Sequence, residues 1–281
     1  MMARMSRFEA RTFRRGDALA EVVPERGGIL SRFAVDGREV LFLDGSTLED
    51  PSKNVRGGIP VLFPSPGKLS GGRFLRFGAE LPMNQHGFAR ERAWMVADER
   101  DGSITLQLLS DPDSRRRFPF DFRLAFTYAL EGASLVIRQR YENHSHEAMP
   151  LHAGFHPYLF VPDAEKARAT ILTRATRAFD NVAKRDIRFH GFDLTRPEVD
   201  LHLADHGEPL SVLTRPDGRG AVEIAACPEF THWVVWTLAG KDFVCVEPWT
   251  APADALNTGE RLFLVAPGEA RELWVRLTAT S

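Results

Sequence analysis

The chain has little cysteine, no long apolar run and no excess of charge of either sign. Its two cysteines, Cys227 and Cys245, form no C-x-x-C pair, which excludes a disulfide scaffold and predicts buried thiols in a reducing compartment. No stretch approaches the roughly 20 apolar residues of a membrane span, and M-M-A-R-M-S-R-F at the start lacks the apolar core of a signal peptide. With 36 Lys plus Arg against 38 Asp plus Glu, nothing global attracts nucleic acid or an anionic membrane. We therefore expect a cytoplasmic protein that binds neither nucleic acid nor membrane.

Long helices and nucleotide-binding motifs are also missing. No segment of about 12 or more residues has the period of an amphipathic helix, although residues 164–169 can form one or two turns. The sequence contains no G-x-x-x-x-G-K-[ST] and no G-x-G-x-x-G directly after a strand. These absences disfavour a parallel α/β sheet and a nucleotide phosphate cradle.

Short alternating segments make up much of the chain instead. Apolar and polar residues alternate with period two in residues 104–109, 122–130, 135–141, 221–225 and 273–278. Turn dipeptides that suit antiparallel hairpins occur at Asp36, Asp101 and Glu131. The pattern predicts an all-β protein, a large antiparallel β-sandwich, for which 43% hydrophobic residues supply a sizeable core. No composition break marks a boundary, so we predict one domain over residues 1–281.

Residues 54–92 differ from the rest of the chain because they are rich in glycine and proline. We expect this segment to run irregularly over the surface, where binding sites tend to lie, although a plain connector has the same composition. From Lys53 to Arg92, seven lysines and arginines minus two glutamates give a local net charge of +5. That charge suits a phosphorylated ligand, and it also suits solvated surface arginines.

Two histidines lie four residues apart in L-H-A-G-F-H-P-Y-L-F, residues 151–160. Helical spacing would suggest a metal site, but Gly154 and Pro157 make a helix unfavourable here. In an extended segment His152 and His156 lie on the same face. A core histidine with satisfied hydrogen bonds is the simple alternative for His156.

A second informative segment is F-V-C-V-E-P-W-T, which begins at Phe243. Alternation puts Phe243, Cys245 and Glu247 on one face of a strand, and the two apolar side chains indicate that this face is buried. A buried carboxylate needs a partner or a function. The alternative for Glu247 is that its side chain points to water at the end of the strand, before Pro248. The alternative for Asp200 in V-D-L-H-L is that it is an exposed acidic residue of a loop.

Five motifs in a fixed order connect these observations. They are R-G-G-I-P-V-L-F-P from Arg56, H-G-F-A-R from His86, H-P-Y-L-F from His156, V-D-L-H-L from Val199, and V-C-V-E-P-W-T with P-A-D-A-L-N near the end. Over residues 27–277 the series resembles the aldose 1-epimerase (mutarotase) family. The resemblance implies a galactose mutarotase-like supersandwich, a large antiparallel β-sandwich with the sugar in a cleft on its open face, in agreement with the fold predicted from alternation.

Carried over position by position, the resemblance makes Glu247 the general base and His156 the general acid. It assigns Arg56, His86 and Asp200 to the sugar hydroxyls and the ring oxygen. Interconversion of α and β anomers removes the proton of the C1 hydroxyl while the ring oxygen is protonated, so one base and one acid suffice. Neither a metal nor an organic cofactor is implied. We expect the neighbouring carboxylate to keep the His156 imidazole protonated at cellular pH.

The predicted function is that of an aldose 1-epimerase acting on a neutral aldohexose. One alternative is a hexose-6-phosphate mutarotase, which shares the motif set and in which Arg56 or Arg90 would hold the phosphate. A second alternative is a protein that is not an enzyme, namely a non-catalytic sugar-binding protein. A glycoside hydrolase using Glu247 and Asp200, and a metal site at the H-S-H sequence of His144, are further alternatives.

Overall fold

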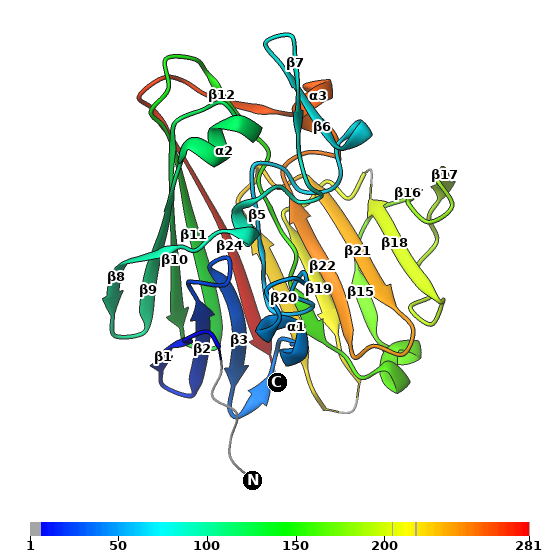
Figure 1. Ribbon diagram of the computed structural model, residues 1–281. Coiled ribbons are helices and arrows are strands. Elements are labelled where there is room, and N and C mark those ends of the chain that lie inside the picture. The colour runs from blue at the N-terminus through cyan, green and yellow to red at the C-terminus, as the bar shows by residue number, and fades with distance from the viewer. Residues whose placement is uncertain (1–6, 204, 217, 281) are drawn as a thin grey trace.

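Strands dominate the computed structural model, which describes residues 7–203, 205–216 and 218–280 (Figure 1). The first large sheet has eight strands in the order β15-β19-β20-β24-β11-β10-β9-β8. Their bounds are Met95–Arg100 (β8), Ser103–Leu109 (β9), Phe122–Glu131 (β10), Ser134–Asn143 (β11), Thr170–Leu172 (β15), Leu210–Thr214 (β19), Ala221–Ala226 (β20) and Ala270–Thr280 (β24). The five segments predicted from alternation lie within β9, β10, β11, β20 and β24 and are thereby confirmed.

The second large sheet also has eight strands, in the order β17-β16-β18-β21-β22-β13-β5, with β14 paired to β22 as well. Their bounds are Val61–Leu62 (β5), Gly154–Phe155 (β13), Tyr158–Phe160 (β14), Arg177–Asp180 (β16), Arg185–Arg188 (β17), Glu198–Leu203 (β18), His232–Leu238 (β21) and Phe243–Trp249 (β22). The strand pairs of both sheets are antiparallel. The predicted large antiparallel β-sandwich is therefore confirmed.

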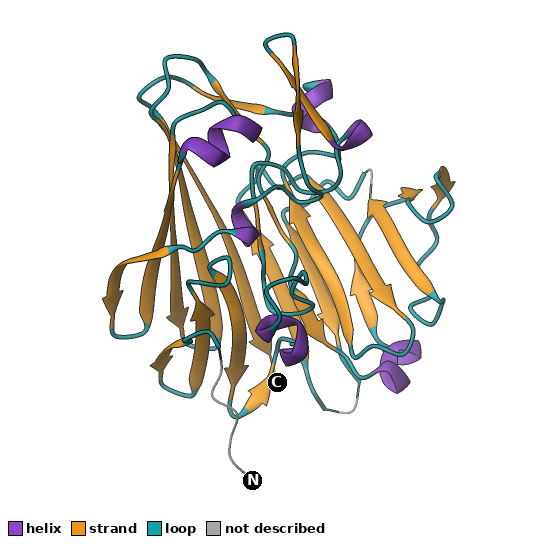
Figure 2. Cartoon of the chain, in the orientation of Figure 1, coloured by secondary structure: helices purple, strands orange, loops and turns teal. Residues whose placement is uncertain are grey.

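Smaller elements surround the two sheets. An N-terminal sheet joins Arg11–Arg15 (β1), Ala18–Val23 (β2), Ile29–Val35 (β3) and Arg38–Glu39 (β4), and two further pairs join Arg73–Arg76 (β6) with Ala79–Pro82 (β7) and Met149–Leu151 (β12) with Phe263–Val265 (β23). The helices are Gly45–Glu49 (α1), Pro112–Arg117 (α2), Ala255–Thr258 (α3) and the 3₁₀ turns Ser70–Gly72 (η1), Ala89–Glu91 (η2) and Asp163–Arg168 (η3). Figures 1 and 2 show α2 and α3 at the upper end of the two large sheets, whereas α1 lies in the middle of the view. Within the described ranges no helix is long and apolar enough to cross a membrane.

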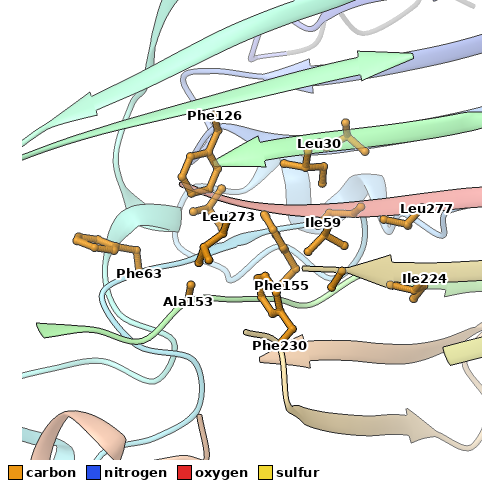
Figure 3. Packing of buried hydrophobic residues seen from close by; sticks show 14 of the residues in the cluster. Leu30, Ile59, Phe63, Phe126, Ala153, Phe155, Ile224, Phe230, Leu273 and Leu277 are labelled. Atoms are coloured by element: carbon orange, nitrogen blue, oxygen red, sulfur yellow. The ribbon is translucent and has the colours of Figure 1, made fainter. Parts of the chain in front are cut away.

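Alternation along β10 explains how the core forms. Its buried side chains take every second position and are Phe122, Leu124, Phe126, Tyr128 and Leu130. Burying an apolar side chain of this size stabilises the fold by about 1.5–3 kcal/mol, so this strand contributes strongly to the packing of the first sheet against the second. In Figure 3, Phe126 and Leu273 of the first sheet face Phe155 of the second, and the Phe126 and Phe155 ring centroids lie 6.1 Å apart. Because one hydrophobic cluster includes residues of all three larger sheets, we infer that the chain folds as one domain.

The expectation that residues 54–92 run over the surface is wrong for the first part of the segment. Residues 57–67 are buried, and β5 enters the second sheet through its pairing with β13. Phe63 is fully buried, with its ring centroid 4.9 Å from that of Phe122. The apolar sequence I-P-V-L-F thus joins the second sheet, and its Phe63 packs against Phe122 of the first, which fixes the flanking parts of the segment on the sheet surface.

Strand β22 is buried on both faces. Val244 and Val246 belong to the main hydrophobic core, whereas Phe243, Cys245 and Glu247 lie on the opposite face, as alternation predicts. Both cysteines are buried and unpaired, as expected. A carboxylate is therefore held on the outer face of the second sheet yet shielded from solvent.

Candidate active site

Antiparallel register brings two rows of side chains onto this outer face. The first row consists of Asp200 on β18, Trp236 on β21, Cys245 on β22 and Tyr158 on β14. The second row consists of His202 on β18, Val234 on β21 and Glu247 on β22. Directly opposite residues of antiparallel strands point to the same side of the sheet, with Cβ atoms about 4.5–5.5 Å apart. Residues that are far apart in the sequence thus meet over a small area.

A cleft of about 620 Å³ lies over this face. The sheet supplies one side, and the irregular segment that carries Arg56, His86 and Arg90 supplies another. The six residues predicted for the site all line the cleft: Arg56, His86, Arg90, His156, Asp200 and Glu247. His152 is buried outside it, with Nδ1 3.1 Å from Ser65 Oγ.

His156 and Glu247 are in direct contact in the cleft. His156 Nε2 lies 3.2 Å from Glu247 Oε1, and both side chains are almost completely buried. The indole Nε1–H of Trp249 donates to the other carboxylate oxygen, Glu247 Oε2, at 3.2 Å. Glu247 therefore is not turned to water, and each of its oxygens has its own partner.

Aromatic side chains fix the orientation of the His156 ring. The ring is nearly parallel to that of Tyr158, with centroids 4.7 Å apart and an interplanar angle of 15°. Its edge contacts include Trp236 at 5.5 Å and His86 at 5.4 Å between centroids. Because these neighbours leave little freedom to rotate, Nε2 stays directed at the carboxylate of Glu247.

Burial moves the two partners toward their uncharged forms. It lowers the pKa of His156 to about 3, and the positive charge of Arg90 acts in the same direction. It also raises the pKa of Glu247 well above its usual range, and the charge of Asp200 adds to that shift. The expectation that Glu247 keeps the imidazole protonated is therefore wrong, because desolvation outweighs the attraction of the carboxylate. One proton held on the carboxyl group and donated to Nε2 leaves the pair without net charge; the imidazole proton is then on Nδ1, which has no hydrogen-bond partner within the described ranges.

His86 is locked in one tautomer. The backbone N–H of Gly67 donates to His86 Nδ1 at 3.0 Å, so the ring proton is on Nε2. Burial, with the nearby His156 adding to it, lowers the pKa of His86 well below its usual value and keeps the ring neutral. His86 has a φ of 66° and Gly87 a φ of 72°. A Cβ at position 87 would lie 2.0 Å from the carbonyl oxygen of Phe63, so only glycine allows this turn.

Only part of the basic segment reaches the cleft. Arg56, Lys68 and Arg90 line it. The Arg56 guanidinium lies 5.3 Å from the centroid of the Trp236 ring, and Arg90 Nη2 donates to the carbonyl oxygen of Gln85 at 2.7 Å. Other cations of the segment form ion pairs elsewhere, namely Lys53 with Asp50, Arg73 with Glu80 and Arg92 with Asp111. The net charge of +5 is therefore spread over the surface rather than gathered at the cleft.

Asp200 lies on a strand and is held from both sides, so it is not an exposed loop acid. Asn181 Nδ2 donates to Asp200 Oδ2 at 2.6 Å, and His202 Nε2 lies 3.5 Å from Oδ1. His202 Nδ1 in turn lies 3.1 Å from His232 Nε2. Since a carboxylate can only accept, His202 carries its proton on Nε2 and accepts from His232 at Nδ1. Although burial alone would raise the pKa of Asp200, the bonds from His202 and Asn181 lower it below the usual value.

Two carboxyl groups of the cleft, those of Asp200 and Glu247, are thus shifted in opposite directions. Asp200 stays ionised at neutral pH, whereas Glu247 binds a proton more readily than a free glutamate does. Such a pair of oppositely perturbed groups is typical of sites that carry out proton transfer.

Sequence reasoning did not assign a role to His202, which lies two positions after Asp200 on the same face of β18 and contacts it. The alternation in V-D-L-H-L contains the signal, because two residues separated by one position share a face. The H-S-H alternative receives no support from the fold: His144 is exposed, and its Nε2 pairs with Glu142 Oε2 at 3.1 Å. Within the described ranges, the one group of three potential metal ligands is His156, Cys245 and Glu247.

Comparison with protein families gives a match over nearly the whole chain. The sequence model of the family described as aldose 1-epimerase matches residues 10–278. A protein of Cenchrus ciliaris named as a putative glucose-6-phosphate 1-epimerase is 29% identical over 262 residues, which cover 82% of this chain and 74% of that protein.

Solved structures with the same fold include one close relative. The Slr1438 protein from Synechocystis sp. PCC 6803 is 35% identical, with a TM-score of 0.94 and full coverage of both chains. A galactose mutarotase-like protein from Lactobacillus casei has a TM-score of 0.79 at 20% identity, covering 97% of this chain and 100% of that one. The second likeness concerns the fold alone, and it agrees with the galactose mutarotase-like sandwich expected from the motifs.

Proposed function

Because the chain belongs to the aldose 1-epimerase family, we propose that it interconverts the α and β anomers of an aldohexose by opening and closing the sugar ring. The observation that carries the proposal is the contact between His156 Nε2 and Glu247 Oε1 at 3.2 Å inside the cleft. A non-catalytic sugar-binding protein would have no use for a buried acid and base in contact with each other.

The proposed reaction consists of two coupled proton transfers. Glu247 takes the proton of the C1 hydroxyl while His156 donates a proton to the ring oxygen, and the bond between C1 and the ring oxygen breaks. Rotation about the C1–C2 bond turns the aldehyde, and the same groups return the protons with reversed roles. Because both reacting oxygens are bonded to C1, an acceptor and a donor 3.2 Å apart can serve them together.

The shared proton of the pair must be on His156 when the ring opens. Transfer of that proton from Glu247 Oε1 to His156 Nε2 creates both the base and the acid without any exchange with solvent. The negative charge of Asp200 raises the pKa of both Glu247 and His156, so Asp200 alone does not decide which of the two holds the proton. No metal ion or organic cofactor takes part in either proton transfer.

The remaining cleft residues would hold the substrate. His86 has a neutral ring with its proton on Nε2, which suits donation to the ring oxygen or the C1 oxygen. Asp200, ionised and held by two donors, suits acceptance from sugar hydroxyls, and the exposed Arg56 suits donation to them. Trp236 and Trp249 offer aromatic surface for the apolar faces of the ring.

A hexose 6-phosphate is the second candidate substrate. Arg56, Lys68 and Arg90 line the cleft, and a relative carries the name of a putative glucose-6-phosphate 1-epimerase. We place a neutral aldohexose first because Glu198 and Asp200 also line the cleft and balance two of its four positive charges, those of Arg56, Lys68, Arg90 and Lys184.

The test is NMR exchange spectroscopy between the α and β anomers of free aldoses and their 6-phosphates, with and without protein. We expect faster exchange for at least one aldohexose. Sugar binding without faster exchange for any of them would favour the sugar-binding alternative. Release of a reducing sugar from a glycoside would favour the hydrolase alternative and overturn the proposal.

A further inference from the structure

Cys245 lies beside the proposed catalytic pair but takes no part in the proposed reaction. It occupies the same face of β22 as Glu247, two positions away, lies directly opposite Tyr158 of β14, and is fully buried. Its sulfur, a nitrogen of His156 and a carboxylate oxygen of Glu247 all lie within 4.8 Å of one another. The other residues of the two rows on this face are aromatic, aliphatic or hydrogen-bonded. A thiol, an imidazole and a carboxylate gathered at one point are the side-chain groups of a metal site.

We propose that His156, Cys245 and Glu247 bind one divalent transition-metal ion of the zinc type, and that the bound ion blocks anomer exchange. Thiolate, imidazole and carboxylate are the ligands that zinc takes in proteins. In a tetrahedral site the edges between such ligand atoms measure about 3.3–3.6 Å. The His156–Glu247 contact of 3.2 Å is already close to one edge, and the sulfur needs to move inward by only about 1 Å.

The charges of the three ligands also match the ion. A thiolate, a carboxylate and a neutral imidazole carry two negative charges, so a bound divalent ion makes the buried group neutral. Arg56 and Arg90 repel a cation that enters the cleft, but the negative charges formed on binding offset that repulsion. His156 and Glu247 line the cleft, which gives the ion an entry path and leaves its fourth position for water.

Inhibition follows from which atoms the ion uses. His156 Nε2 and a Glu247 oxygen would both coordinate the metal, and neither could then exchange a proton with the sugar. The proposed metal binding does not depend on the proposed function, whereas the proposed inhibition of anomer exchange rests on it. Free zinc would therefore inhibit anomer exchange by this protein.

The experiment titrates the purified protein with Zn²⁺ by calorimetry and with Co²⁺ by absorption spectroscopy, in which a thiolate ligand gives a charge-transfer band. We expect one ion per chain, a Co²⁺ thiolate band, and loss of anomer exchange that a chelator reverses. Cys245→Ala should weaken Zn²⁺ binding at least about tenfold, abolish the band and make anomer exchange insensitive to zinc. Cys245→Ser serves as a second variant in case the alanine variant does not fold.

Cys227→Ala is the matched control, because Cys227 is the other buried cysteine and lies outside the cleft. It should leave metal binding and inhibition unchanged. Equal Zn²⁺ affinity in wild type and the Cys245 variants, or no binding at all, would overturn the inference. A Cys245-dependent cobalt band in a protein that exchanges no sugar anomers would support the metal site and contradict the proposed function instead.

Discussion

The indole of Trp249 and the carboxylate of Glu247 are joined by a hydrogen bond of 3.2 Å between two residues of the same strand face. The bond occupies Oε2 and leaves Oε1 to His156. Strand β22 thus supplies both the proposed base and the group that orients it. A carboxylate held in this way loses little entropy when it meets a substrate, which favours catalysis over loose binding.

Replacement of Glu247 by glutamine tests the base. Glu247→Gln keeps the shape and can still accept the Trp249 bond through its amide oxygen, but it cannot take a proton. Anomer exchange should therefore fall at least about 10²-fold while the thermal unfolding midpoint changes little. NMR exchange rates and a circular dichroism melt measure the two effects.

Glu198→Gln is the control for the loss of a carboxylate as such. Glu198 also lines the cleft and also accepts from an indole, that of Trp236 at 3.0 Å. This variant should retain exchange within about tenfold, since Glu198 has no contact with the proposed acid. Near-normal exchange in Glu247→Gln would remove Glu247 from the mechanism.

The two histidines of L-H-A-G-F-H-P-Y-L-F should differ sharply. His156→Asn removes the proposed acid and should abolish most of the exchange, by about 10²-fold or more. His152→Asn changes a buried residue outside the cleft that contacts Ser65, so the folded variant should keep much of its activity. Rates are compared per folded molecule. The reverse outcome would assign the proton transfer to His152.

Much of the fold was predictable because the signal was local. In β10 every second side chain is apolar and buried, and a strand buried on one face produces that pattern directly. The burial of residues 57–67 was not predictable in this way, because glycine and proline interrupt the alternation there. Only the pairing of β5 with a strand almost 100 positions away buries it.

The candidate site was predictable mainly through its motifs. Glu247 and His156 could be placed in a shared site by resemblance, but their direct contact depends on how β14 and β22 pair. The opposite pKa shifts of Asp200 and Glu247 depend on solvent exclusion and on Asn181 and His202. Such effects arise only after distant segments have met, and no local pattern encodes them.

The buried His152 should make the protein sensitive to acid. Burial lowers its pKa to about 3, against about 6.5 in the unfolded chain. Between these values the unfolded state binds one proton more, so this residue makes the free energy of unfolding fall as pH falls, by about 1.4 kcal/mol per pH unit. Above pH 6.5 it has no such effect.

Urea unfolding at pH 7.5 and pH 5 measures this contribution. Wild type should lose roughly 2 kcal/mol more than His152→Asn between the two pH values. The surface variant His190→Gln is the control for loss of a histidine and should behave as wild type does. An unchanged pH dependence in His152→Asn would mean that His152 is protonated in the native state.

His202 should act on the sugar through Asp200. His202→Ala removes the group at Asp200 Oδ1 and frees the carboxylate to turn, so KM for the sugar should rise about tenfold with a smaller change in kcat. His202→Gln keeps an N–H donor at a similar reach and should restore most of the affinity. A fall in kcat alone would instead indicate that His202 acts on the proton transfer.

The charge of the substrate determines how activity responds to salt and to Arg90. For a neutral aldohexose, kcat/KM should hardly change with ionic strength, and Arg90→Ala should be mild. For a hexose 6-phosphate, kcat/KM should fall as salt rises, because salt screens attraction between exposed charges, and Arg90→Ala should raise KM for the phosphate while sparing the free sugar.

The decisive measurement compares both sugars at low and high salt in wild type, Arg90→Ala and Arg100→Ala. Arg100 lies at the end of β8, does not line the cleft and is largely exposed, so its loss controls for the change in net charge. We expect the free sugar to be preferred in all three proteins. Arg90 is partly buried, and its guanidinium already donates to Gln85, so it has limited freedom to follow a phosphate. A clear preference for the phosphate that is lost in Arg90→Ala and kept in Arg100→Ala would make the hexose 6-phosphate the substrate.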